Sequence, residues 1–215
     1  MSRIRPSQFA AAIVACASGV ASAAAVIGPV SINSPQGDLG GSFLLANIIN
    51  QSSLSAAYVS GVTDFATYTG ATTAGGLTGS GFTATSNNGP QQFSFDLGAL
   101  YSIDAIGLWQ SGSVGSVTSF ELYADNDNDF TNGVGALILG PTGLGFGTAN
   151  AQVFNFAAAQ SRFVHFNGLG SQQPPDFYGM NEIIFSGSPA NRVPEPGSLA
   201  LAGLALALLA RRARA

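Results

Sequence analysis

The sequence predicts an all-β protein, a single β-sandwich or jelly roll, flanked by an N-terminal signal peptide and a short C-terminal hydrophobic helix. Two observations predict this fold class. Short apolar stretches recur through the middle of the chain, separated by Gly, Ser, Asn or Pro. The composition, with 28 Gly, 15 Phe and only 8% charged residues, is that of a turn-rich β protein that can still bury a core.

The predicted strands follow one another through the second half of the central region. The stretch FSFDL at 93–97 alternates apolar and polar residues, as a half-buried strand does. Helical periodicity is absent except at 41–50, and 69–90 is predicted to be a long surface loop with one weak strand. The other predicted strands are 103–109, 117–124, 136–139, 152–156, 162–166 and 181–185.

Basic residues are almost confined to the two ends of the chain. There is no lysine, and between residues 6 and 210 the only arginines are Arg162 and Arg192. The acidic residues are spread through that same region. Because no basic patch is available to neutralise phosphates, the sequence argues against nucleic acid as a partner and against electrostatic binding to anionic lipid.

Residues 1–23 are predicted to be a signal peptide for Sec-type export. Arg3 and Arg5 precede a weakly apolar stretch at 9–20, and 21–23 is an Ala-Ser-Ala cleavage site. A lipobox-like stretch ending at Cys16 is the alternative, in which Cys16 would be lipidated. Cleavage after residue 23 leaves a mature chain without cysteine, which needs no disulfide in an oxidising compartment.

The C-terminal apolar run at 197–210 is short for a stable membrane span. A helix of this length covers roughly 21 Å, less than the roughly 30 Å hydrocarbon core of a bilayer. The run is apolar on every side, unlike a core helix, and Arg211 and Arg212 follow it as a positive-inside stop would. The sequence therefore predicts a marginal, transient inner-membrane segment.

The last 23 residues, 193–215, resemble the PEP-CTERM sorting signal of Gram-negative bacteria. The three parts of that signal occur in order, namely a Pro-Glu-Pro motif, an apolar helix and an arginine cluster. The resemblance implies processing by an exosortase and then release or attachment at the cell surface, in bacteria that make extracellular polysaccharide. The alternative is a Pro-rich linker before an ordinary tail anchor. The predicted sorting residues are Val193, Pro194, Glu195, Pro196, Arg211 and Arg212.

The predicted central domain, 24–187, joins this tail through a linker at 188–192 and resembles a discoidin-like, galactose-binding-type β-sandwich. The resemblance rests on FDLG at 95–98, RFV at 162–164 and NEIIF at 181–185, in that order. The chain departs from the family in lacking the pair of cysteines that clamps the termini and a tryptophan in the early loop.

Two groups of acidic residues are candidate calcium ligands, and no other cofactor is predicted. Asp125, Asp127 and Asp129 alternate as calcium ligands can, although Phe130 replaces the glycine of an EF-hand loop and no Glu stands at position 12. A solvated acidic turn is the other interpretation. Separately, the discoidin resemblance places 60–68 at the metal loop of that family and implies a structural calcium site that uses Asp64 and Glu182.

No catalytic residues are predicted, and the protein is expected not to be an enzyme. His165 is the only histidine, and its sequence context predicts a residue on the polar face of a strand. Neither a G-x-S-x-G elbow nor an H-E-x-x-H motif occurs. A pair of catalytic carboxylates, as in a glycosidase, remains an open alternative, because the two groups would come together only in the folded chain.

The best candidate for ligand binding is the Pro-stiffened stretch GSQQPPDFYG. Aromatic rings can stack on sugar C–H groups while amides bind hydroxyls. Trp109 is expected in the core. The predicted function is a non-catalytic surface or matrix protein associated with exopolysaccharide or biofilm, with glycan as a ligand; a glycan-active enzyme and a structural protein without ligand are the alternatives. The candidate ligand-binding residues are Gln172, Gln173, Asp176, Phe177 and Tyr178.

Overall fold

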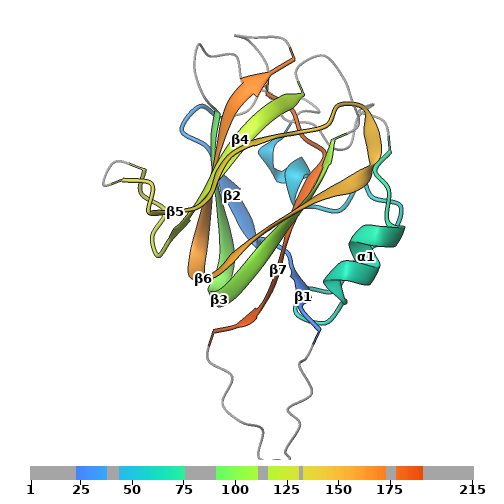
Figure 1. The fold of residues 1–215 in the computed structure, drawn as a ribbon, viewed down its shortest axis with the longest axis horizontal. Helices are drawn as coiled ribbons and strands as arrows, with labels where there is room; N and C mark the ends of the chain where they lie inside the picture. The colour runs from blue at the N-terminus through green and yellow to red at the C-terminus, as the bar shows by residue number, and fades with distance from the viewer. Residues whose placement is uncertain are drawn as a thin grey trace, which may run out of the picture.

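A computed structural model describes residues 23–37, 44–75, 91–110, 116–130, 133–172 and 178–190. They form one antiparallel seven-stranded sheet in the order β1-β7-β3-β6-β4-β5, with β2 paired to β3 (Figure 1). The strands are β1 (Ala25–Ile27), β2 (Ser31–Asn33), β3 (Gln91–Gln110), β4 (Val117–Asp125), β5 (Ala136–Gly143), β6 (Thr148–Ser171) and β7 (Glu182–Pro189). The helices are the 3₁₀-helix η1 (Leu45–Ile48) and the α-helix α1 (Phe65–Ala71).

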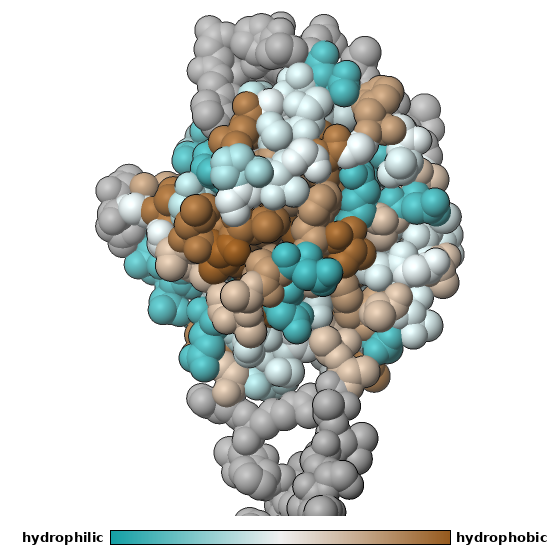
Figure 2. Space-filling model, in the orientation of Figure 1, coloured by the Kyte–Doolittle hydropathy of each residue, from teal (hydrophilic) through white to brown (hydrophobic). Residues whose placement is uncertain are grey.

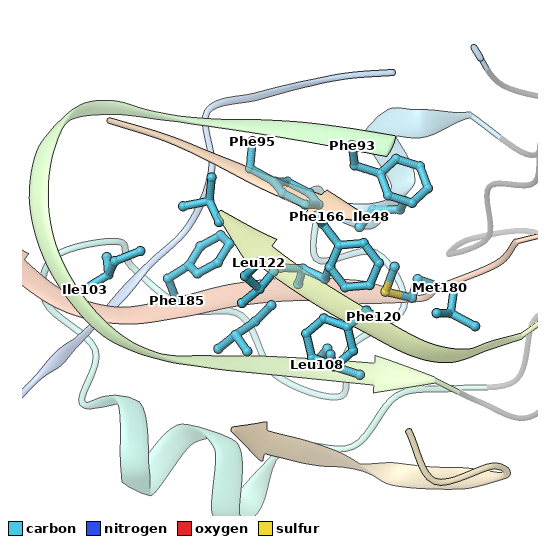
Figure 3. Close-up of a cluster of buried hydrophobic side chains, with 14 of the residues drawn as sticks. Ile48, Phe93, Phe95, Ile103, Leu108, Phe120, Leu122, Phe166, Met180 and Phe185 are labelled. Carbon is cyan, nitrogen blue, oxygen red and sulfur yellow. The ribbon is translucent and has the colours of Figure 1, made fainter. Parts of the chain in front are cut away.

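The sheet folds into a sandwich because its two longest strands bend. In β3 the pairing with β6 jumps at residues 97–100, where Gly98 has a φ of +82°. Such a bulge lets one strand turn a corner and run through both layers. Figure 3 shows β3 turning back so that its two halves face each other. The all-β sandwich predicted from the sequence is thus confirmed.

Aromatic side chains fill the space between the two layers. The rings of Phe120 and Phe166 stack 4.8 Å apart, and Phe93 lies 5.9 Å from Phe166. Phe95 meets Phe185 of the other layer edge-on at 5.9 Å. All five side chains are fully buried, so this core accounts for five of the 15 phenylalanines of the chain (Figure 3).

A second, smaller cluster lies between the sheet and α1. Asp64 caps this helix, because its Oδ1 accepts a hydrogen bond from the Thr67 amide at 2.7 Å. Tyr68 presents its ring edge to Trp109 at 6.0 Å, and the Trp109 indole donates to the Thr72 carbonyl. Trp109 is therefore a core residue, as predicted.

The helix α1 was not predicted, and its last three residues fall in the stretch expected to be a loop. The predicted strands 93–97 to 181–185, in contrast, lie inside strands of the structure, except that Asn181 precedes the first residue of β7. Four of the predicted strands are parts of two longer strands, however. Residues 93–97 and 103–109 both belong to β3, and 152–156 and 162–166 both belong to β6. β7 also extends to Pro189, two residues beyond the predicted domain boundary, and the next amide, that of Ala190, donates to the Leu100 carbonyl at 3.1 Å.

The strand β5 lies at an edge of the sheet and carries apolar side chains outward. Leu137 is 55% exposed. Figure 2 shows an apolar patch on this face, over β5. The opposite edge of the sheet is β1, which is only three residues long.

Candidate functional site

The sandwich has two ends, here called the terminal end and the loop end, which carry different residues. At the terminal end, β1 begins and β7 ends, because Ala25 pairs with Gly187 in an antiparallel ladder. At the loop end lie the first residue of β3, Gln91, and the first residue of β7, Glu182. The second half of β3, residues 101–110, spans about 30 Å between the two ends at roughly 3.3 Å per residue.

The described residues of the predicted ligand-binding stretch, 170–172 and 178–179, lie at the loop end. Gln172 follows the last residue of β6 and is exposed. Its amide donates to the Ser116 carbonyl at 2.8 Å, so its backbone is held while its side chain faces solvent. Gln173, Asp176 and Phe177 lie outside the described residues.

Tyr178 is not available as a platform for a sugar ring. Its side chain is 6% exposed and belongs to the main core cluster. The ring lies over Gly168, where a Cβ would stand 3.2 Å from its Cδ1 atom. The prediction that Tyr178 binds ligand through its ring face is therefore wrong, because the ring fills space in the core at the loop end.

Glu182 is a buried carboxyl group at the same end. Its Oε2 accepts a hydrogen bond from the Gln51 amide at 3.0 Å, and its Oε1 has no hydrogen-bond partner among the described residues. Burial raises the pKa of Glu182 to about 9, against the opposing effect of the Gln51 hydrogen bond. Such a group is neutral at pH 7 unless a cation lies beside it.

Sequence reasoning missed Gln51, the residue that binds Glu182. Its φ of 63° is in the left-handed region, which is uncommon for a residue other than glycine. Its side-chain Oε1 accepts a hydrogen bond from the Tyr58 amide at 2.8 Å, which ties the loop together. No local pattern in the sequence marks a glutamine for this role.

Asp64 and Glu182, predicted to share one calcium site, are far apart. Asp64 lies opposite Ala25, which itself pairs with Gly187. Gly187 and Glu182 stand five residues apart on β7, or roughly 17 Å. The predicted pair is therefore wrong. The hydrogen bonds from Thr67, at the start of α1, lower the pKa of Asp64.

The three aspartates lie in a turn that begins at the last residue of β4, Asp125. The Asn126 amide donates to Asp125 Oδ1 at 2.6 Å, and the Asp129 amide donates to Asp127 Oδ1 at 2.9 Å. Across the described ranges, no three His, Cys, Asp or Glu side chains gather closely enough to hold a metal ion. These hydrogen bonds are those of an acidic turn. Calcium binding at Asp125, Asp127 and Asp129 stays a prediction.

His165 lies in β6 as predicted, but it is buried and not on a polar face. Its Nε2 lies 3.4 Å from Asp125 Oδ2, and the Phe130 ring lies 4.5 Å from the imidazole. Burial lowers the pKa of His165, although Asp125 and Asp127 act in the opposite direction. The histidine is 1% exposed, so a substrate could not reach it in this arrangement.

Comparison with known proteins identifies the tail and the fold separately. Residues 192–215 match the PEP-CTERM protein-sorting motif. The chain carries a PEP-CTERM tail. This tail implies an exosortase substrate that is exported and transiently anchored in the membrane at its C-terminus. The sorting residues themselves, and residues 1–22 of the predicted signal peptide, lie outside the described residues.

The domain that precedes the PEP-CTERM tail has the fold of a discoidin-like β-sandwich. It is similar to the family 32 carbohydrate-binding module of Clostridium perfringens NanJ, solved with galactose, with a TM-score of 0.51 and 15% identity over 76% of this chain and 98% of that one. It is also similar to CBM32-3 of a C. perfringens family 31 glycoside hydrolase, with a TM-score of 0.50 and 11% identity over 76% and 91% of the two chains. At these identities the likeness shows the fold alone.

No curated protein matches the sequence of this PEP-CTERM chain. Among the described helices, none is long and apolar enough to cross a membrane. The predicted hydrophobic helix at 197–210 lies outside the described residues.

Proposed function

We propose that this protein is a non-catalytic, glycan-binding surface or matrix protein, processed by an exosortase and associated with exopolysaccharide. The observation that carries the proposal is the combination of a carbohydrate-binding-module fold with a PEP-CTERM tail on one chain. The fold supplies a scaffold whose loops can bind sugar, and the tail delivers that scaffold to the outer side of the cell.

The position of the two ends supports the loop end as the glycan-binding surface. β7 ends at the terminal end, and the sorting tail follows it in the chain. If the protein is attached through that tail, the loop end, with the exposed Gln172, would face away from the anchor. The loop end would lie about 30 Å from the end of the domain that is attached. The proposed contacts are the amides of Gln172 and Gln173, the carboxylate of Asp176 and the ring of Phe177.

A structural calcium ion beside Glu182 is part of the proposal. Calcium prefers carboxylate and carbonyl oxygens, and a cation would satisfy both the orphaned Oε1 and the buried negative charge. Glu182 would hold the ion next to the loop that contains Gln51. The ion would keep Glu182 ionised and fix this loop to β7.

The sorting motif is tested by replacing Pro194, Glu195 and Pro196 together with alanine. We expect the unprocessed precursor to accumulate in the inner membrane, because the exosortase would lose its recognition motif. Fractionation followed by mass spectrometry of the full chain measures this. An unchanged mature mass in the variant would exclude the sorting assignment.

Glycan binding is tested by replacing Gln172 and Phe177 separately with alanine. Binding to a glycan array should fall by roughly two- to tenfold for each variant, since a lost stacking or hydrogen-bond contact costs about 0.5–1.5 kcal/mol. Gln160, exposed near the terminal end, supplies the matched control as Gln160→Ala. Equal binding by all three variants would rule out this surface.

The same purified protein separates the proposal from its two alternatives. A glycan-active enzyme would shorten a polysaccharide that it binds, which chromatography of the polysaccharide detects. A purely structural matrix protein would bind no glycan on the array. Binding without turnover is the result expected.

A further inference from the structure

A hollow of about 510 Å³ opens at the terminal end of the sandwich, away from the loop end. Five elements or their flanking residues contribute to its lining: the start of β1, the start of α1, β3, β6 and β7. Its polar side chains are Asp64, Asp104, Asn155 and Ser186, and Ala23 and Ala24 complete one wall.

The two carboxylates of this hollow are held in place by the fold. Asp104 occupies a bulge of β3, where Ile103 and Ala105 pair with consecutive residues of β7. Its Oδ1 accepts a hydrogen bond from the Ser186 hydroxyl at 2.6 Å. Asp64 is held at the start of α1 by the Thr67 amide.

The chain enters the domain along this hollow. The Ala24 carbonyl accepts a hydrogen bond from the Phe65 amide at 3.0 Å, and the Val26 amide donates to the Thr63 carbonyl at 2.8 Å. These two bonds flank the pair formed by Ala25 and Asp64. The backbone of Ala24 is therefore held in place next to Ala25, the residue that lies opposite Asp64.

We propose that the hollow binds the new N-terminal ammonium group that signal-peptide removal creates on Ala24. Hydrolysis of the bond between Ala23 and Ala24 consumes one water, which leaves a carboxylate on the released peptide and an amine on Ala24 that takes up a proton. The amide of the precursor is neutral, so only the processed chain places a cation between Asp64 and Asp104. The inference rests on the proposed export, and it adds a structural consequence of that processing.

The charges around the hollow agree with this assignment. Asp64 from the start of α1 and Asp104 from β3 are the titratable groups that line it. Asn155 and Phe156 from β6 and Ser186 from β7 are uncharged, and no arginine is among the lining residues. An α-amino group has an ordinary pKa of about 7.7–8.0, and neighbouring carboxylates within about 4–6 Å would raise it.

The absence of lysine makes the experiment specific, because the α-amino group is then the only primary amine of the mature chain. Reductive methylation with ¹³C-formaldehyde keeps its charge and gives a single labelled signal, whose pH titration by NMR yields the pKa. We expect a pKa at least about one unit above that of the unfolded chain. Asp64→Asn and Asp104→Asn should each lower it, and the double variant should bring it to the unfolded value. Glu121→Gln, the same change of charge on β4, should leave it unchanged.

Acetylation gives a second readout, because it removes the charge that methylation keeps. It should lower the Tm of the mature protein by about 2–4 °C, and it should have no such effect on the double variant. If the α-amino group has an ordinary pKa that neither aspartate substitution changes, the proposal is overturned, whereas the proposed export is not affected. Mass spectrometry of the exported protein is the separate check: a first residue other than Ala24, such as a lipidated Cys16, would overturn the predicted cleavage and this proposal with it.

Discussion

Replacing Glu182 with glutamine should remove most of the pH dependence of the unfolding free energy between pH 5 and pH 9 when no divalent cation is present. Burial raises the pKa of this carboxyl group from 4.5 to about 9. Between those values the native state holds a proton that the unfolded chain has released. Stability therefore falls as pH rises, by about 1.4 kcal/mol per pH unit, and the total loss is on the order of 5 kcal/mol.

Urea unfolding in EDTA at pH 5, 7 and 8.5 measures this effect. The glutamine side chain is uncharged at every pH, so the variant should be the more stable protein at pH 8.5. Glu121→Gln is the matched control, because Glu121 is the other described glutamate and is only part-buried, bonded to Tyr123 and Asn167. If the unfolding free energy of Glu182→Gln depends on pH as steeply as that of the wild type, Glu182 is ionised in the native state without a cation.

Calcium tests the proposed metal site in the same two proteins. At pH 8 the ion should raise the unfolding free energy of the wild type, because it favours the ionised carboxylate that is otherwise costly to bury. It should have little effect on Glu182→Gln. Equal stabilisation of both proteins would place any calcium elsewhere, and no stabilisation of either would exclude the site.

Replacing Phe166 with alanine should lower the unfolding free energy by about 3–5 kcal/mol. The ring is fully buried, stacks on Phe120 at 4.8 Å and lies 5.9 Å from Phe93. Its removal loses apolar burial and leaves a cavity between layers that the bent strands prevent from closing. A loss of this size removes a large part of the stability of a typical domain.

The midpoint of urea unfolding at pH 6 measures this loss. Phe146→Ala is the matched control, since Phe146 is 54% exposed, and this variant should change the unfolding free energy by no more than about 0.5 kcal/mol. Similar midpoints for the two variants would show that the stacked rings do not form the core.

Local patterns were sufficient to predict the strands from β3 to β7, but not the three-residue strands β1 and β2. The alternation at 93–97 places Phe93 and Phe95 on one face, and both are buried. A period of two follows from the geometry of the strand alone, so it can be read without knowing the partner strand. Trp109, expected in the core as part of the predicted strand 103–109, is fully buried.

The exposure of a loop residue could not be predicted in this way. Gln172 is exposed, whereas Tyr178, in the same candidate stretch, is buried against Gly168. Which residues face solvent depends on how β6 and β7 pack at the loop end, and this packing joins residues distant in sequence. The left-handed Gln51 that binds Glu182, 131 residues later, left no local signal for the same reason.

The sequence by itself determined the strands from β3 to β7, the all-β class and the PEP-CTERM tail, because each depends on the order of neighbouring residues. Only the tertiary structure decided that Asp64 and Glu182 lie at opposite ends of β7, and that Asp64 shares a hollow with Asp104 and the start of β1. The pairing of β1 with β7 separates Asp64 from Glu182, and a bulge in β3 places Asp104 in the hollow. Both features belong to paired strands rather than to one strand.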